Sequence, residues 1–329
     1  MMTSREVVLA NTMQENPDRP AFNFSGERRN DLFGGGISGS KKREESRSWK
    51  EKGFEYYTDA WGNVWYRVEG RSQGGEIFEP VLKDWKALDT MTVPDLDDPA
   101  RYEEMAKAFR EVAGDRFKMA YMPIWVFATS RYMRKMEIYF TDLIEYREEI
   151  DRLHEIVVGL TERIIHRMAD AGADGFMYCE DLGIQDRTLI SPAMWRDIFR
   201  PHYKRLTGAA HSRGLKVYMH SCGYNWALID DLVEAGVDCF QFDQPYAYDM
   251  PALAAKLRGH KVGLWSPVDI QKVLPTGDKA FIEAEARRMV ETFRGGLMLK
   301  NYGDLKGIGV EPEWDRWAYE ALVKAAGLA

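Results

Sequence analysis

The stretch that decides the fold is LKVYMHSCGYNWALIDDLVEAGVDCFQFDQ, residues 215–244. It begins with a short apolar run at 215–223, continues through a segment with helical apolar spacing at 226–236, and ends in a second short apolar run at 237–244. Short apolar strands that alternate with helices are typical of parallel sheets with crossover connections. This stretch therefore predicts one strand–helix–strand unit of a parallel α/β fold.

The same alternation extends in both directions along the chain. Strands are predicted at 19–24, 117–127, 172–183, 215–223, 237–244, 260–267 and 295–303. Helices are predicted at 98–113, 142–171, 191–214, 226–236, 250–259, 278–294 and 313–327. Seven strands come close to the eight of a (β/α)8 TIM-type barrel. A doubly wound open sheet is disfavoured because no Gly-x-Gly-x-x-Gly loop follows any strand. We therefore expect a single barrel domain over residues 1–329.

An insertion interrupts this pattern at residues 32–70. Residues 32–53 are rich in glycine, serine and charge, which predicts a mobile loop, either a plain flexible insertion or a lid over an active site. Residues 54–70, FEYYTDAWGNVWYRVEG, place aromatic and β-branched residues on both sides of a Gly-Asn turn and predict a hairpin.

The composition narrows the class of protein. The 329 residues are 45% hydrophobic and carry a net charge of −7, which argues against a nucleic-acid surface. No apolar window is long enough to span a membrane, and the first twenty residues lack the core of a signal peptide. Three scattered cysteines are too few for a disulfide framework. We expect a cytoplasmic protein that binds neither nucleic acid nor membrane.

Polar residues collect at the predicted carboxyl ends of the strands, where barrel enzymes carry their active sites. They include Glu180, Asp181, His220, Cys222, Gln241, Asp243, Asn301 and Asp304. His220 and Cys222 are two residues apart on one strand, so both side chains can reach one ion. Imidazole and thiolate are good zinc ligands, and zinc usually takes four ligands. The alternative is a buried histidine beside a buried cysteine.

The other two cysteines are interpreted by strand alternation. Cys179 and Glu180 are adjacent, so only one can face the barrel interior. We expect Glu180 to face inward, as a ligand, a base or a structural carboxylate, and Cys179 to pack beneath the helices. Cys239 shares a face with Gln241 but lies roughly 7 Å deeper by strand rise, so it is expected in the core.

Five stretches together resemble the uroporphyrinogen decarboxylase superfamily. They are MTSREVVLANTMQENPDRPAF (2–22), TDAWGNVWYRVEG (58–70), YCEDLG (178–183), ISPAMWRDIFRPHYKRLTGAAHSRGLKVYMHSCG (190–223) and LIDDLVEAGVDCFQFDQ (228–244). The resemblance runs through nearly the whole chain and implies a (β/α)8 barrel.

Within the superfamily, DAWG (59–62) and HSCG (220–223) resemble the cobamide-dependent methyltransferases, such as methylcobamide:coenzyme M methyltransferase. The arginine-rich N-terminal segment of true decarboxylases is replaced here by GERRNDLFGG (26–35). The resemblance implies a zinc ion held by His220, Cys222 and a later cysteine, and a corrinoid protein as partner. GGLMLKNYGDLKG (295–307) has no cysteine at the matching position near Gly303. Glu180 is then the expected third ligand, with Asp304 as an alternative.

These observations predict a zinc-dependent methyltransferase that acts between a methylcobamide on a partner protein and a thiol or related small-molecule acceptor. The expected metal ligands are His220, Cys222 and Glu180, and the expected catalytic residues are Glu180 and Asp243. The expected substrate-binding residues are Gln241, Asn301, Asp304 and Tyr178. Analogy with the family suggests a homodimer.

Two alternatives remain at this point. One is a metal-free carboxy-lyase acting on a carboxylated substrate, with Arg131, Arg134 and Arg187 as candidate substrate contacts. The other is a non-catalytic barrel that binds a corrinoid or another ligand. Metal content would distinguish the methyltransferase from the lyase, and corrinoid binding without turnover would favour the ligand-binding barrel.

Overall fold

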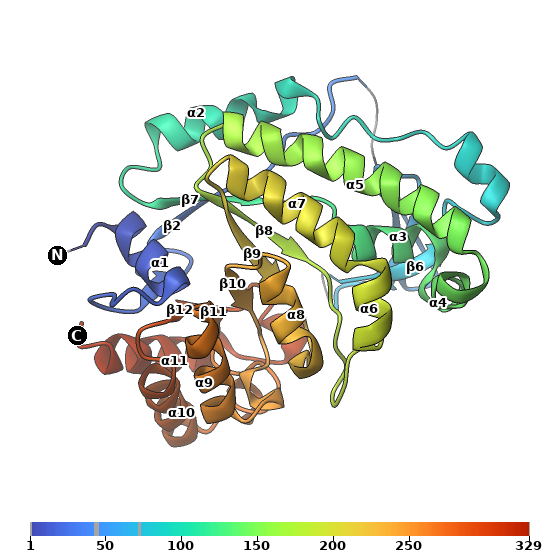
Figure 1. The fold of residues 1–329 in the computed structure, drawn as a ribbon. Helices are drawn as coiled ribbons and strands as arrows, with labels where there is room; N and C mark the ends of the chain where they lie inside the picture. Colours follow the sequence, from blue (N-terminus) through green and yellow to red (C-terminus); the bar gives the residue numbers. More distant parts are fainter. Residues whose placement is uncertain (1, 43–45, 72–73, 329) are drawn as a thin grey trace.

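The computed structural model describes residues 2–42, 46–71 and 74–328. Its central feature is an eight-stranded sheet in the order β1-β12-β11-β10-β9-β8-β7-β2, in which every hydrogen-bonded pair is parallel (Figure 1). The strands are β1 (Ala21–Asn23), β2 (Leu32–Gly35), β7 (Phe117–Tyr121), β8 (Gly175–Cys179), β9 (Lys216–His220), β10 (Cys239–Gln241), β11 (Gly263–Ser266) and β12 (Leu297–Lys300). This arrangement confirms the predicted TIM-type barrel.

The seam between β1 and β2 is closed by side-chain as well as backbone contacts. Asp31 donates its N–H to the carbonyl of Phe22 at 2.7 Å and accepts the Phe22 N–H on Oδ2 at 2.8 Å. Arg19 pairs with the same carboxylate at 2.7 Å. A buried carboxylate thus supplies the hydrogen bond that a regular ladder would have made.

Helices surround the sheet, and one closes its bottom. They are α1 (Ser4–Met13), α2 (Glu103–Glu111), α3 (Val126–Arg134), α4 (Met136–Glu145), α5 (Arg147–Asp170), α6 (Pro192–Ile198), α7 (Arg200–Ser212), α8 (Ile229–Glu234), α9 (Met250–His260), α10 (Lys279–Thr292) and α11 (Pro312–Ala325). The apolar side chains Val7 and Val8 of α1 pack with the residues that fill the barrel. Thr12 contacts the hydroxyl of Tyr218 at 2.7 Å. With its amino-terminal end plugged, the barrel is accessible from its carboxyl-terminal end.

The prediction of a loop over residues 32–53 was wrong for its first four residues. Residues 32–35 form β2, the eighth barrel strand, which pairs with β7. A Cβ on Gly34 would overlap the ring of Tyr121, and one on Gly35 would overlap Met105 and Phe109. Glycine here lets neighbouring side chains approach the strand closely, which is why a core strand has the composition of a loop.

The rest of the insertion, together with one strand that follows it, forms a second, four-stranded antiparallel sheet. It contains β3 (Ser48–Glu51), β4 (Phe54–Thr58), β5 (Val64–Val68) and β6 (Glu76–Glu79). The predicted hairpin is confirmed as β4–β5, and β3 is a second strand inside the predicted loop. Residues 43–45 of that loop lie outside the described residues.

Two element boundaries near the carboxyl-terminal mouth also differ from the prediction. The strand predicted at 117–127 ends at Tyr121, and α3 already begins at Val126. The helix predicted at 191–214 is divided at Phe199 into α6 and α7, next to Pro201. The single-turn helices are η1 (Trp85–Asp89), η2 (Pro99–Tyr102), η3 (Trp226–Leu228), η4 (Pro245–Ala247), η5 (Leu274–Thr276) and η6 (Lys306–Ile308).

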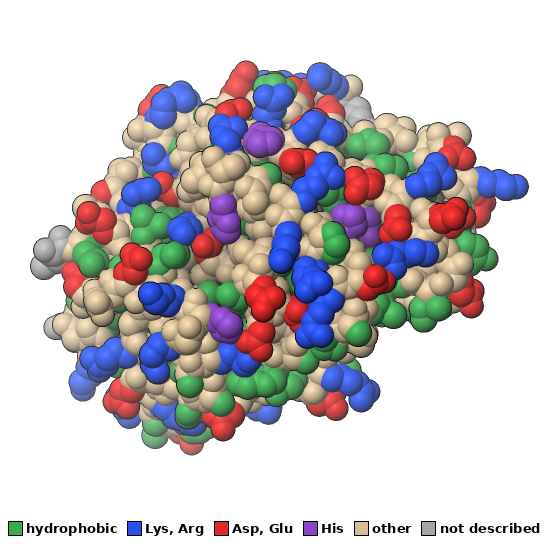
Figure 2. Space-filling model, viewed as in Figure 1, with side chains coloured by type: hydrophobic (Ala, Val, Ile, Leu, Met, Phe, Trp, Pro, Cys, Tyr) green, Lys and Arg blue, Asp and Glu red, His purple; other side chains and the backbone are tan. Residues whose placement is uncertain are grey.

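The surface carries charges of both signs. On the face shown in Figure 2, lysine and arginine are interspersed with aspartate and glutamate, and no extended basic patch is seen. Across the described ranges, every helix is too short or too polar to cross a lipid bilayer.

Candidate metal centre

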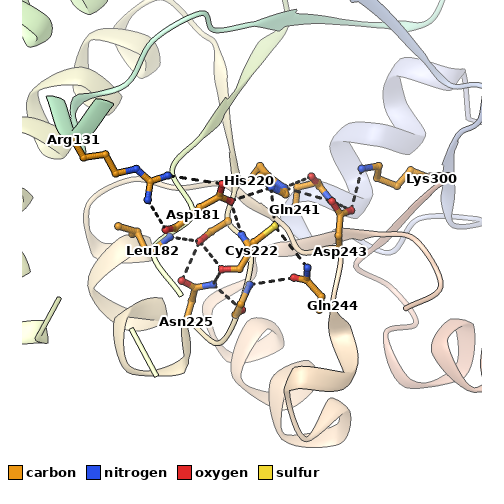
Figure 3. Close-up of polar contacts among 12 residues, drawn as sticks. Arg131, Asp181, Leu182, His220, Cys222, Asn225, Gln241, Asp243, Gln244 and Lys300 are labelled. Atoms are coloured by element: carbon orange, nitrogen blue, oxygen red, sulfur yellow. Dashed lines mark hydrogen bonds and ion pairs between the residues drawn. The ribbon is translucent and has the colours of Figure 1, made fainter. Parts of the chain in front are cut away.

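Three ligand-type side chains meet at the carboxyl-terminal mouth of the barrel. They are Asp181 after β8, His220 at the end of β9 and Cys222 two residues further on (Figure 3). His220 Nε2 lies 3.3 Å from Asp181 Oδ1 and 3.4 Å from Cys222 Sγ. One ligand atom from each residue lies within 4.8 Å of the other two.

This geometry fits a zinc ion. Zinc bonds of about 2.0–2.3 Å at tetrahedral angles separate neighbouring ligand atoms by roughly 3.3–3.8 Å. The His220 distances to Asp181 and Cys222, 3.3 and 3.4 Å, fall in that range. Imidazole, thiolate and carboxylate are all zinc ligands, and three protein ligands leave a fourth position for a small molecule, as in catalytic zinc sites.

A chain of polar contacts orients the imidazole for such a role. Lys300 Nζ donates to Asp243 Oδ1 at 3.1 Å, and Gln241 Nε2 donates to the same oxygen at 2.6 Å. The Gln241 amide is therefore turned with Oε1 toward His220 Nδ1, 2.5 Å away. A carbonyl oxygen only accepts, so Nδ1 carries a proton, and Nε2 is the nitrogen that can release its proton and bind an ion between Asp181 and Cys222.

The carboxylate of Asp181 is held against the same imidazole. Its backbone adopts a left-handed conformation with φ of 52°, and Oδ1 accepts the Cys222 N–H at 2.9 Å. Burial opposes ionisation of Asp181, but its contacts with His220 outweigh this effect and lower the pKa of the carboxyl below its usual range. Burial likewise opposes protonation of His220, yet Asp181 and Cys222 raise its pKa well above the usual value. Without an ion, the cluster is an ion pair.

The loop that carries Cys222 is fixed by close backbone packing. Gly223 has φ of 75°, and a Cβ there would overlap the backbone of Gly183. Asn225 Nδ2 donates to the carbonyls of Cys222 and Gly223 at 3.2 and 3.0 Å. Gln244 Oε1 accepts the Gly223 N–H at 3.1 Å, and its Nε2 lies 3.7 Å from Cys222 Sγ. The thiol is therefore positioned before any ion binds.

The expected orientations of Cys179 and Glu180 are reversed in the structure. Cys179 is in register with His220 on the neighbouring strand and is exposed in the mouth. Glu180 is fully buried and accepts the N–H groups of Phe127 and Ala128 at 3.2 and 2.8 Å. Burial raises the pKa of Glu180 to about 8 against the opposing effect of Arg131. Asp181, and not Glu180, is the carboxylate brought to His220 and Cys222.

Glu180 faces away from the barrel interior because the first turn of α3 needs a hydrogen-bond acceptor. Its Ncap, Trp125, provides no side-chain hydrogen bond to the free N–H groups of the helix. Glu180 supplies that acceptor from β8. With Glu180 turned outward, alternation places Cys179 on the inner face.

The predicted substrate-binding residues are divided between separate places. Gln241 joins the site through His220, as does Asp243. Tyr178 points away from the barrel interior and packs beneath the helices, with its ring centroid 3.8 Å from that of Trp125. Asn301 Oδ1 accepts the Ser25 N–H at 3.1 Å. Asp304 lines a different cavity, beside the inserted sheet.

Two members of the site were missed by the sequence prediction, Asp181 as a possible ligand and Lys300. Asp181 follows Glu180 directly, and only the turn after β8 brings it to face His220. Lys300 lies two residues after Met298, which fills the barrel, so strand alternation could have placed it inside.

Two cavities flank the candidate metal centre. One, of about 390 Å³, reaches Cys179 and is bounded by the inserted sheet and α3. The other, of about 250 Å³, is lined by Cys222, Gln244 and Asp269 among others. The smaller cavity reaches the cluster itself through Cys222, whereas the larger one reaches Cys179, the neighbour of His220 on the adjacent strand.

The three arginines named for a carboxylate-binding pocket do not converge. Arg134 is buried and pairs with Asp142 at 2.7 Å. Arg187 is exposed beside Asp186. Arg131 alone lies near the site, with one guanidinium nitrogen 3.9 Å from Asp181 Oδ2. In the described part of the chain this trio forms no common anion site.

Comparison with known proteins identifies the family. Eight parallel strands with surrounding helices define a TIM-barrel protein. The sequence profile of uroporphyrinogen decarboxylase (URO-D) matches residues 68–326, so the chain belongs to this family, as its sequence motifs predicted. No curated protein matches the chain.

Among solved structures, a methyltransferase from Methanosarcina mazei has a TM-score of 0.62 and 17% sequence identity, covering 81% of this chain and 75% of that one. This likeness confirms the fold. A B12-independent methionine synthase from Shewanella sp. W3-18-1 has a TM-score of 0.44 and 12% identity, covering 98% of this chain and 86% of that one.

Proposed function

We propose that this protein is a metal-dependent methyltransferase. In this proposal, a methyl group passes from a methyl-corrinoid, carried by a partner protein, to a thiol or related acceptor. The observation that carries the proposal is the meeting of Asp181, His220 and Cys222 at the barrel mouth. The methyltransferase from Methanosarcina mazei, as a structural neighbour, agrees with it.

A zinc ion at this position would supply thiol activation, because coordination deprotonates a thiol that is mostly protonated at neutral pH. The ligand set of one thiolate, one imidazole and one carboxylate donates less charge than a set with two thiolates, which makes the ion a harder Lewis acid. His220 offers Nε2 because Gln241 holds its Nδ1 proton. Asp243 and Lys300 keep that amide in place.

In the proposed transfer, the methyl group would move from cobalt to sulfur without its bonding electrons. The electron pair of the acceptor thiolate forms the new S–CH3 bond. The Co–CH3 bond would break at the same time, and the partner's corrinoid would keep its electron pair. The proton of the acceptor thiol would leave to solvent when the sulfur binds the metal as a thiolate, so no proton would move during the transfer itself.

The test begins with metal content, and the three cysteines offer a matched control. Wild-type protein should hold about one zinc per chain, and His220→Ala, Asp181→Ala and Cys222→Ser should lose it. Cys179→Ser should keep the ion, since this thiol is outside the cluster. Glu180→Gln should also keep it.

The second step is turnover with methylcobalamin as donor and small thiols as acceptors, followed by thioether formation. Loss of turnover in Cys222→Ser with retention in Cys179→Ser is the expected result. Wild-type protein without metal, even after reconstitution with zinc, would refute the proposal and direct attention to a carboxy-lyase assay. Metal and corrinoid binding without turnover would point to a ligand-binding barrel.

A further inference from the structure

The cavity of about 390 Å³ beside the candidate metal centre has aromatic walls. Tyr57 and Trp65 come from adjacent strands of the hairpin, and their rings are nearly parallel, with centroids 6.0 Å apart. Tyr132 of α3 meets Trp65 edge-on at 4.7 Å. Trp61, in the hairpin turn, and Trp125, just before α3, add two more indole rings. The volume suits a small organic ligand.

Among the described residues that line this cavity, Asp59 provides the one formal charge. Its carboxylate accepts four hydrogen bonds, from the N–H groups of Trp61 and Asn63 at 3.0 Å and from Asn63 Nδ2 and Trp65 Nε1 at 2.8 Å. The four acceptor positions of the carboxylate are therefore occupied. Among residues 2–42, 46–71 and 74–328, Asp59 forms no ion pair: no lysine, arginine or histidine nitrogen lies within 4.0 Å of its carboxylate oxygens.

This combination has a specific chemical preference. The cavity offers a negative charge and several electron-rich ring faces, but the charged group has no acceptor position left for a new hydrogen bond. The nearby guanidinium of Arg67, 5.5 Å from the Tyr57 ring, is paired with Glu55 at 2.8 Å. A cation with N–H groups would lose hydrogen bonds on entering, whereas an alkylated ammonium has few or none to lose.

We propose that this cavity binds an alkylated ammonium group. Cys179 lines the cavity and is in register with His220 on the next strand, so the cavity adjoins the candidate metal centre. The next step rests on the proposed function. If the protein methylates a thiol, the acceptor is a thiol with an alkylated ammonium tail. Its sulfur then lies at the metal centre and its tail in the cavity that the aromatic rings line. An anionic tail, such as the sulfonate of coenzyme M, would meet the charge of Asp59.

The binding of the cation can be tested on metal-free protein, independently of any transfer. Choline is compared with 3,3-dimethylbutan-1-ol, its neutral isostere of the same shape, by calorimetry and tryptophan fluorescence. Choline should bind roughly tenfold more tightly, because cation–π attraction in a desolvated site is worth about 1–2 kcal/mol. Equal affinity of the two compounds, or no binding of either, would overturn the proposal.

Variants locate the binding site. Trp65→Leu and Tyr132→Leu change two touching rings that belong to different elements, the hairpin and α3, so a folding defect in one leaves the other informative. Each should weaken choline binding about tenfold. Trp49→Leu is the matched control, because Trp49 stacks on Tyr56 on the other face of the inserted sheet. Choline binding that survives both wall variants would refute the assignment.

The acceptor is tested with three thiols that differ only in the tail: thiocholine, 3,3-dimethylbutane-1-thiol and 2-mercaptoethanesulfonate. Binding to cobalt-substituted protein is read from the thiolate-to-cobalt charge-transfer band, with thiocholine expected to bind most tightly. If the sulfonate binds most tightly, the cationic acceptor is wrong. If cobalt does not bind but choline does, the proposed function fails while the cation site stands.

Discussion

Replacement of Gln241 by methionine should weaken metal binding without removing any ligand. Gln241 Oε1 accepts the Nδ1–H of His220 at 2.5 Å, at a site where Gln241 is almost completely buried. Methionine has a similar length but cannot accept this hydrogen bond effectively. The imidazole then loses the contact that selects the tautomer with a free Nε2.

The size of the effect follows from the orphaned donor. A buried N–H without a partner costs about 1–3 kcal/mol. Metal-bound His220 must keep its Nδ1–H, whereas in the metal-free variant the ring can give up this orphaned proton and keep Nε2–H toward Asp181, so the cost falls on the metal-bound state. We therefore expect the zinc dissociation constant to rise about 10- to 100-fold, or about 1.4–2.7 kcal/mol. Asp243 keeps its contact with Lys300, so the fold should survive.

The assay is competition for zinc between the protein and a chromophoric chelator at fixed pH, with thermal unfolding recorded in parallel. Gln14→Met is the control, because Gln14 Nε2 donates to the carbonyl of Val262 at 2.7 Å, away from the cluster. It should alter stability but leave the dissociation constant within about threefold of wild type. An unchanged zinc affinity in folded Gln241→Met, or an equal loss in the control, would refute the orienting role of Gln241.

Three further predictions concern stability. Burial lowers the pKa of His154 to about 3, so as the pH falls below about 6.5 the unfolded chain protonates this imidazole and the folded chain does not; the free energy of unfolding should therefore fall by about 2 kcal/mol between pH 8 and pH 5 on account of His154. His154→Gln, which still offers an acceptor to Tyr139, should remove that part of the pH dependence measured by denaturant unfolding, and an unchanged pH dependence would contradict the assignment. Gly223→Ala should lower the free energy of unfolding by about 1–3 kcal/mol or more and weaken zinc binding, because the φ of 75° and the contact with the Gly183 backbone leave no room for a Cβ. A variant that is fully stable and binds zinc as tightly as wild type would argue against this loop geometry. Tyr178→Phe should leave turnover unchanged and raise the free energy of unfolding by up to about 1 kcal/mol, because the buried hydroxyl has no hydrogen-bond partner among the described residues. A loss of turnover would instead support the substrate-binding role predicted from the sequence.

The sequence by itself determined the architecture. The alternation of short apolar strands and helices, as in 215–244, is set by local periodicity, and burial of both sheet faces leaves few alternative folds for it. The strand-end location of His220 and Cys222 followed from the same pattern. The eighth strand was missed because Gly34 and Gly35 are selected by contacts with Tyr121 and Phe109, which lie far away in the sequence.

The tertiary structure decided which carboxylate joins the site. Alternation established that Cys179 and Glu180 face opposite ways, but the choice between them depended on α3, whose unsatisfied N–H groups take Glu180 as an acceptor. The left-handed turn at Asp181 then carries that residue to His220. Local sequence specifies a strand and its two faces, whereas the side chain that completes a site depends on polar groups from elements distant in the chain.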